Sequence, residues 1–207
     1  MNFFSAQPIK SLAAAFTSAV VLAFFTACQS ADPSSVGYET PGADRAGNSK
    51  AAREKTEAAM VAFDGGDLEI AERLLKEALT DDVAFGPAHN NLGQVYFEQG
   101  RYYLAAWEFE YASKLMPYRP EPRNNLGLVL EAVRRYDEAV TQFQAAKDLA
   151  PDHPELIGNL ARAKYRRGDR GDQLRDLLGE ILLKDTRPSW RDWAENRLVH
   201  LDDPDDR

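Results

Sequence analysis

Apolar residues recur through the middle of the chain at intervals of three and four, the spacing of one face of an α-helix. Short polar turns separate these stretches, and several contain glycine, as at Gly66, Gly100 and Gly168. Pro117 and Pro151 end two of the stretches, because proline cannot donate a backbone hydrogen bond. The pattern therefore predicts an all-α chain built from pairs of helices, each pair joined by a short turn.

The helix pairs repeat with a period of 34 residues, since the tetrapeptide NNLG occurs at residues 90–93 and again at 124–127. At this shift further identical residues align: Ala105 with Ala139, Phe109 with Phe143, Ala112 with Ala146, and Pro117 with Pro151. One period earlier stand Ala59, Ala71 and Ala78, and one period later Asn159, Leu160 and Ala161. A helix–turn–helix repeat of this length resembles the tetratricopeptide repeat.

The resemblance implies an α-solenoid of about four repeats within residues 51–187, followed by a capping helix and an acidic tail in residues 188–207. The repeats fall at about 52–85, 86–119, 120–153 and 154–187. We expect the two helices of a repeat to pack closely at Gly93 and Gly127, where a larger side chain would not fit. Trp190 and Trp193 of the capping helix are expected to pack on the fourth repeat, with an aromatic docking patch as the alternative.

The amino-terminal 27 residues have the pattern of a secretory signal. Lys10 is their one charged residue, and an apolar run from Leu12 to Phe25 ends in small residues directly before Cys28. The run is shorter than the ~20 residues that span a bilayer. The segment FFTAC resembles a bacterial lipobox, which implies cleavage before Cys28 and attachment of lipid (palmitate) to it. An uncleaved signal anchor and an ordinary signal peptide are the alternatives.

Residues 28–50 combine the cysteine with Pro, Gly, Ser and Asp and lack apolar periodicity, so we expect a flexible tether. Together with the lipobox this predicts a lipid-anchored protein of the bacterial cell envelope that faces the periplasm. Gln29 after the cysteine favours the outer over the inner membrane, by resemblance to enterobacterial sorting.

Composition argues against several classes of function. The chain has 25 Lys and Arg against 33 Asp and Glu, a formal net charge of −8, so we expect no nucleic-acid partner. Its three histidines lie at no spacing that would bind a metal, and we expect no cofactor. There is no Ser-His-Asp constellation and no phosphate-binding glycine loop. We therefore expect a binding module rather than an enzyme.

In the tetratricopeptide-repeat family the first helix of each unit lines a concave groove that binds peptides or proteins. By resemblance, the groove positions of the first unit are Arg53, Met60 and Phe63. Those of the second, third and fourth units are Asn90, Asn91, Gln94, Phe97, Glu98, Asn124, Asn125, Leu128, Glu131, Asn159, Arg162, Tyr165 and Arg166. The carboxylate clamp of cochaperones is not expected, because Asn90, Gln94 and Leu128 stand where its basic residues would be.

Asparagine recurs at one position per unit, as Asn91, Asn125 and Asn159. An amide can both donate and accept, so a row of them could pair with the backbone of an extended peptide. This resembles the asparagine ladder of the O-GlcNAc transferases. Local hydrogen bonds between helices are the alternative.

Basic residues concentrate late in the array, at Arg134, Arg135, Arg162, Lys164, Arg166, Arg167, Arg170 and Arg175. They could bind an acidic partner segment or an anionic surface. The blander interpretation, which we favour, is a solvated helix face balanced by Asp169, Asp172 and Asp176.

These features favour a membrane-anchored scaffold that binds a peptide or protein of an envelope complex, similar to lipoproteins that act in pilus or secretion assembly. A recruiter of peptidoglycan-modifying enzymes is the alternative. Self-association through the first unit or the terminal helix is a further alternative, because the ends of a repeat array can bind one another.

Overall fold

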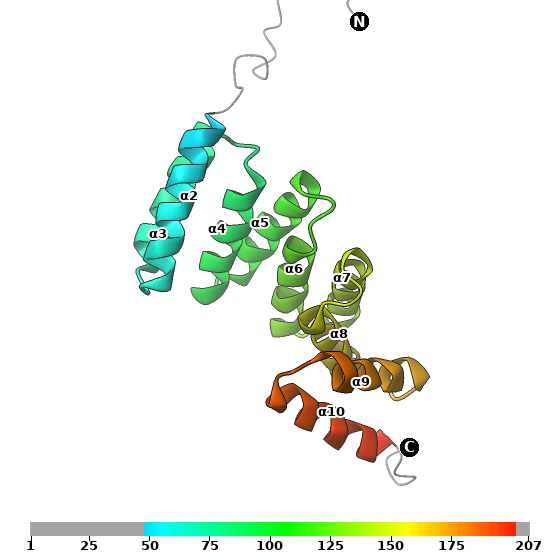
Figure 1. Cartoon of the computed structure of the whole chain (residues 1–207). Helices are drawn as coiled ribbons and strands as arrows, with labels where there is room; N and C mark the ends of the chain where they lie inside the picture. The colour runs from blue at the N-terminus through cyan, green and yellow to red at the C-terminus, as the bar shows by residue number, and fades with distance from the viewer. Residues whose placement is uncertain (1–47, 202–207) are drawn as a thin grey trace, which may run out of the picture. The chain divides into compact units, whose positions relative to one another are not determined.

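The computed structural model describes residues 48–201, and within this range every regular element is a helix (Figure 1). The helices are α2 (Ser49–Asp64), α3 (Leu68–Asp81), α4 (Gly86–Glu98), α5 (Tyr102–Leu115), α6 (Glu121–Ala132), α7 (Tyr136–Leu149), α8 (Pro154–Arg167), α9 (Asp172–Lys184) and α10 (Pro188–Leu201). No helix in residues 48–201 has the length and apolar character needed to cross a membrane.

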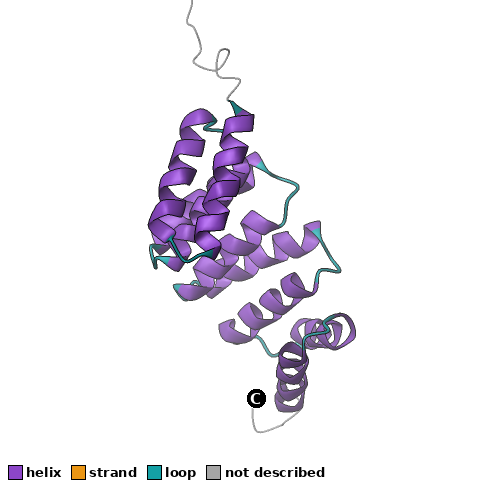
Figure 2. Ribbon diagram, turned by 60° about the vertical axis from the view of Figure 1, so that its left-hand side comes forward, coloured by secondary structure: helices purple, strands orange, loops and turns teal. Residues whose placement is uncertain are grey.

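Eight of these helices form four pairs, α2/α3, α4/α5, α6/α7 and α8/α9, and each pair packs on the next (Figures 1 and 2). The first helices α2, α4, α6 and α8 also contact one another in order, and α10 packs on α9. The all-α solenoid of about four repeats with a terminal helix is confirmed.

Each of the two central repeats is held together by an aromatic ring of the second helix that packs on a glycine of the first. A Cβ atom built on Gly93 would lie 2.7 Å from the ring of Phe109, and one on Gly127 would lie 2.6 Å from the ring of Phe143. Both rings are almost completely buried. Glycine is therefore required because the ring occupies the space of a side chain, as the sequence predicted.

Trp190 of α10 also packs on a glycine of the fourth unit, where a Cβ on Gly158 would lie 2.8 Å from its ring. The position is a different one, because the residue 34 positions after Gly127 is Ala161. Trp193 packs edge-on against Trp190 and Tyr165, with ring centroids 5.7 and 6.2 Å away. The opposite face of α10 exposes Glu195, Val199 and other residues. The two tryptophans thus pack on the fourth repeat, as expected of a cap.

The amino-terminal boundary differs slightly from the sequence prediction. α2 begins at Ser49, inside the expected tether, because the side chain of Asn48 accepts a hydrogen bond from the Ala51 N–H and caps the helix. The expected signal, Cys28 and the rest of the tether, together with the tail after Leu201, lie outside the described residues.

The turns inside the four repeats share a left-handed residue at the same position. Gly66, Gly100 and Gly168 have φ of 85°, 72° and 104°, and Arg134 occupies the equivalent place with φ of 62°. Among residues 48–201, Arg134 is the one residue other than glycine that has a positive φ. A side chain in this conformation costs roughly 1–2 kcal/mol, so the third repeat carries local strain that the other three avoid.

We expect Arg134→Gly to stabilise the protein by about 1 kcal/mol, because glycine adopts positive φ without the steric cost. Urea unfolding followed by circular dichroism measures the change. Arg135→Gly, next to it at negative φ, serves as the control and should not stabilise. An unchanged or lower stability of Arg134→Gly would contradict the strain.

Glu72 joins the first and second repeats through charged hydrogen bonds. Its carboxylate accepts from Lys76 Nζ at 2.6 Å, Gln99 Nε2 at 3.0 Å and Arg101 Nη1 at 3.0 Å. Gln99 and Arg101 belong to the turn between α4 and α5, whereas Glu72 lies on α3. Partial burial opposes ionisation, but the bonds from Lys76, Gln99 and Arg101 outweigh it and lower the pKa of Glu72 to about 2.

The low pKa of Glu72 makes the contribution of this residue to the stability of the fold dependent on pH. The ionised carboxylate stabilises the fold fully above its ordinary pKa of 4.5, and the contribution is lost as pH falls toward about 2. We expect Glu72→Gln to cost about 1–3 kcal/mol at pH 7 and almost nothing at pH 2. Urea unfolding between these pH values, with Glu77→Gln as the exposed control, measures it. A cost independent of pH would contradict the assignment.

Candidate binding groove

The repeat period brings groove positions of successive first helices into columns. One column contains Phe63, Phe97, Glu131 and Tyr165, which are 34 residues apart on α2, α4, α6 and α8. A second column at the same spacing contains Met60, Gln94, Leu128 and Arg162. Because neighbouring first helices contact each other, the columns run along the array from repeat to repeat.

An apolar pocket of about 260 Å³ opens between α2, α4 and α6. Its lining residues are Phe63, Gln94, Phe97, Glu98, Phe109, Asn125 and Leu128. Six of these seven residues, all except Phe109, belong to the predicted groove, and none of the six is buried. Phe109 comes from the second helix α5 and was not expected here. Aromatic and aliphatic walls with a few amide groups suit an apolar side chain of a peptide whose backbone needs hydrogen-bond partners.

The asparagines of the groove bond to each other across neighbouring helices. Asn125 Nδ2 donates to Asn90 Oδ1 at 3.1 Å, and Asn159 Nδ2 donates to Asn124 Oδ1 at 2.9 Å. Asn90 in turn donates to Asn91 Oδ1 at 3.3 Å. The amides therefore form links from one repeat to the next, which is the alternative that the sequence left open.

Burial separates these asparagines into two groups. Asn124 and Asn159 are 5% and 3% exposed, so they do not present their amides on the groove surface as expected. They are buried because their amides satisfy one another between α6 and α8. Asn90, Asn91 and Asn125 remain partly exposed near the pocket.

Asn159→Ala should destabilise the protein by about 1–2 kcal/mol, because it leaves the buried Asn124 oxygen without its partner. Asn91→Ala, in the equivalent position two repeats earlier but partly exposed, should change stability by less than about 0.5 kcal/mol. Urea unfolding of both variants tests the difference. Equal costs at the two positions would show that the Asn124–Asn159 bond has no special weight.

The carboxyl-terminal end of the groove is cationic. Glu131, 5% exposed, accepts from Arg162 Nε at 3.0 Å and Arg162 Nη2 at 2.8 Å, and it pairs with Arg166 Nη1 at 3.2 Å. Arg162 also lies over the ring of Trp190, 5.3 Å from its centroid. Two guanidinium groups therefore share one carboxylate at this point of the groove.

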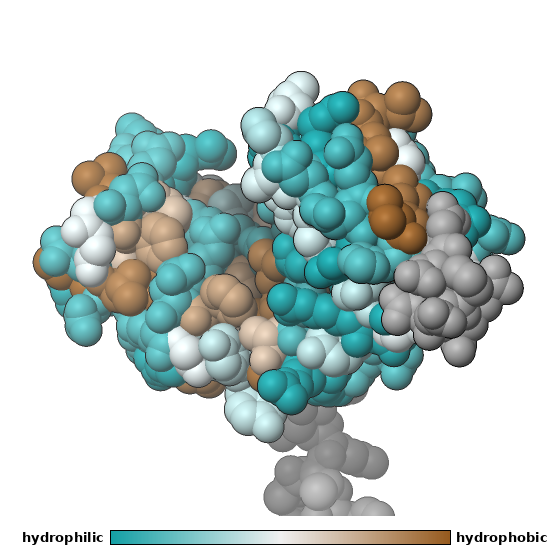
Figure 3. Space-filling model, turned by 90° about the horizontal axis from the view of Figure 1, so that it is seen from below, coloured by the Kyte–Doolittle hydropathy of each residue, from teal (hydrophilic) through white to brown (hydrophobic). Residues whose placement is uncertain are grey.

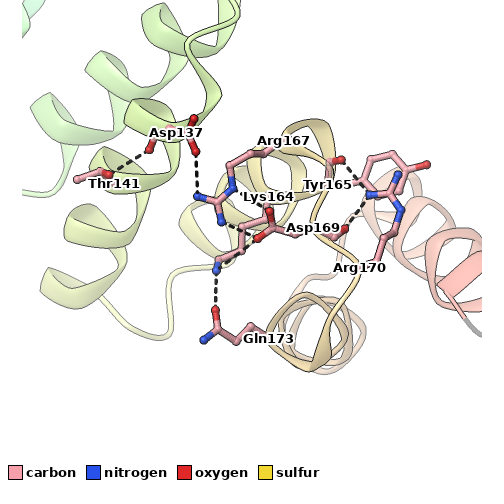
Figure 4. A network of polar contacts seen from close by, with 8 residues as sticks. All are labelled: Asp137, Thr141, Lys164, Tyr165, Arg167, Asp169, Arg170 and Gln173. Atoms are coloured by element: carbon pink, nitrogen blue, oxygen red, sulfur yellow. Dashed lines mark hydrogen bonds and ion pairs between the residues drawn. The ribbon is translucent and has the colours of Figure 1, made fainter. Parts of the chain in front are cut away.

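Tyr165 is the centre of a second group of cations. The guanidinium carbons of Arg170 and Arg197 lie 4.4 and 4.7 Å from the centre of its ring. Arg170 donates to the backbone oxygens of Tyr165 and Asp169 at 3.2 and 2.7 Å (Figure 4). We call Tyr165, Arg170 and Arg197 the Tyr165 site. Arg197 was missed from the sequence because it lies on α10, beyond the repeats that defined the groove positions.

Other members of the basic cluster are neutralised locally, as the blander interpretation held (Figure 4). Arg167 donates two bonds to Asp169, at 2.7 and 2.6 Å, and lies 3.6 Å from Asp137. The bonds from Arg167 hold the pKa of Asp169 below its usual range. Lys164 lies 3.9 Å from Asp169, and Arg135 pairs with Glu138.

The face of the molecule seen from below is largely hydrophilic with separate hydrophobic patches (Figure 3). Exposed aromatic side chains also occur on α5, outside the predicted groove, where Tyr103 and Trp107 are 89% and 69% exposed.

Residues 48–201 contain no group of three or more His, Cys, Asp or Glu that could hold a metal ion.

Comparison with known proteins agrees with this architecture. One family model of the tetratricopeptide repeat matches residues 56–120, and a second matches residues 120–153. No curated protein sequence matches the chain.

Several solved structures share the fold at low sequence identity. MamA from Desulfovibrio magneticus RS-1 is 20% identical, covering 73% of this chain and 86% of that chain, with a TM-score of 0.65. TTC0263, a thermophilic TPR protein of Thermus thermophilus, is 16% identical, covering 75% of this chain and 86% of that chain, with a TM-score of 0.61. The first TPR of Spaghetti (RPAP3), bound to an HSP90 peptide, is 17% identical, covering 58% of this chain and 96% of that chain, with a TM-score of 0.56. Residues 56–153 therefore consist of tetratricopeptide repeats, and α8 and α9 extend the same array of helix pairs.

Proposed function

We propose that the protein is a membrane-anchored scaffold whose groove binds a peptide segment of another protein in a cell-envelope complex. The observation that carries this proposal is the apolar pocket between α2, α4 and α6, which is open and has amide groups beside aromatic walls. A side chain of a partner could fill the pocket while its backbone bonds to Gln94 or Asn125.

The comparisons support a partner of this kind. The solved TPR of Spaghetti (RPAP3) holds an HSP90 peptide, SRMEEVD, and Cut9 is seen in a hetero-tetramer with Hcn1. The lipobox-like segment that ends at Cys28 supports the membrane anchor, which would hold the array at the envelope, on the outer rather than the inner membrane. A pathway in pilus or secretion assembly agrees with such an anchored adaptor.

The test is a crosslinking pull-down of the full-length protein from its native membranes, compared with a Phe97→Gln/Leu128→Gln variant. Gln94 already occupies the position of Leu128 one repeat earlier, so the repeat tolerates this side chain. We expect the partner to be recovered at least ~10-fold less with the variant, since losing buried apolar anchors costs about 1–2 kcal/mol or more.

The matched control is Tyr103→Gln/Trp107→Gln, which removes two exposed aromatic side chains from α5, away from the pocket. It should recover the partner as well as the unmodified protein does. If the control loses the partner and the pocket variant keeps it, the working surface is the outside of α5 and the proposal is wrong. Recovery of several peptidoglycan-modifying enzymes through the pocket would favour the recruiter alternative.

A further inference from the structure

The two ends of the groove differ in chemistry. The pocket between α2, α4 and α6 is mainly apolar, whereas the carboxyl-terminal end collects the guanidinium groups of Arg162, Arg166, Arg170 and Arg197. Glu131 bonds to the first two of these. Within residues 48–201, no carboxylate lies within ion-pair distance of Arg170 or Arg197. A chain with a net charge of −8 thus keeps a local excess of positive charge at one end of its groove.

The cations of the Tyr165 site are held in place without using up their hydrogen-bonding capacity. Stacking on an aromatic ring occupies the face of a guanidinium group and leaves the N–H groups at its edge available. Arg197 stacks on Tyr165 and Trp193 and makes no ion pair within residues 48–201; its Nε is buried, so the Nη groups at the end of the side chain are the donors that a partner could reach. Arg170 uses one nitrogen, Nη1, to bond to backbone oxygens. Such pre-organised guanidinium groups are suited to paired bonds with a carboxylate.

We propose that the groove binds an acidic segment, with Asp or Glu carboxylates of the partner docking on Arg170 and Arg197 around Tyr165. This inference rests on the proposed function and specifies the chemistry of the partner. A short acidic peptide fits better than an extended polyanion or an anionic membrane, because the surrounding acidic surface would repel a large negative partner.

The layout of the helices sets the spacing of such a segment. Leu128 of the pocket lies on α6 and Tyr165 lies on the next first helix, α8. Packed helix axes lie roughly 8–10 Å apart, so one to two helix steps separate the two sites. An extended peptide covers this with about three to six residues at ~3.3 Å each. The expected partner therefore carries an apolar residue about three to six positions from an acidic one.

The test measures binding of fluorescein-labelled hexaglutamate to the full-length chain in detergent by fluorescence anisotropy. We expect saturable binding that weakens with salt, and none of labelled hexaglutamine. Arg170→Gln/Arg197→Gln should weaken binding at least ~10-fold. The control Arg73→Gln/Arg119→Gln removes the same charge from exposed positions elsewhere and should change binding less than about twofold.

Arg197 packs on two aromatic rings, so its replacement could disturb α10. The single variant Arg170→Gln, at an exposed position, avoids this and should weaken binding at least about threefold with an unchanged helical circular dichroism spectrum. Absence of hexaglutamate binding, or an equal loss in the control, would overturn the proposal.

The chain's own acidic residues 202–207, DDPDDR, follow directly after α10 and are the competing occupant. If a chain ending at Leu201 binds hexaglutamate ~10-fold more tightly than the full chain, the site belongs to this tail and the partner assignment is wrong. Equal affinities support an external acidic segment.

The same variants separate this inference from the proposed function. Phe97→Gln/Leu128→Gln should still bind hexaglutamate, since neither residue belongs to the Tyr165 site. A native partner that is lost with this pocket variant but retained by Arg170→Gln/Arg197→Gln would uphold the scaffold and overturn the acidic segment. If hexaglutamate binds at the Tyr165 site but the native partner is recovered equally well with Phe97→Gln/Leu128→Gln, the acidic-segment inference is upheld and the pocket proposal is overturned.

Discussion

The contact of an aromatic ring with a glycine, made once in each of the two central repeats, is the constraint on which the array depends. Phe109 and Phe143 lie where the side chains of Gly93 and Gly127 would be, so the two helices of each repeat approach closely. Each buried ring contributes roughly 2–3 kcal/mol of apolar burial. The contact also fixes how each first helix is rotated, which in turn decides the residues that face the groove. Trp190 on Gly158 continues this packing into the terminal helix.

Once the first helices are fixed, single substitutions along a column change the chemistry of the groove. The column of Phe63 and Phe97 continues with Glu131 and Tyr165, and the column of Gln94 and Leu128 continues with Arg162. The groove therefore passes from apolar walls to a stretch where arginine, glutamate and tyrosine interact. The groove changes from apolar to charged at Glu131. A buried carboxylate needs ion-pair partners, and Arg162 and Arg166 supply them.

Polar links join neighbouring repeats, and one of them also borders the apolar pocket through Asn125. Glu72 ties α3 to the turn of the second repeat, and the asparagine pairs tie α4 to α6 and α6 to α8. The sequence shows that asparagine recurs at one position per repeat. This recurrence is compatible both with a peptide-binding row and with hydrogen bonds between helices. The direction in which each amide points depends on the helix opposite, which no local pattern contains.

The sequence by itself determined the all-α architecture, the repeat length and the glycine, alanine and phenylalanine positions of the core, because packing the same helix pair repeatedly demands the same residue sizes at the same intervals. It also indicated most of the residues that line the apolar pocket, including Phe97 and Leu128. Only the tertiary structure decided that Asn124 and Asn159 are buried, that Phe109 reaches the pocket and that Arg197 joins Tyr165. Those outcomes depend on contacts between residues far apart in the chain, whose distances and burial the repeat period does not specify.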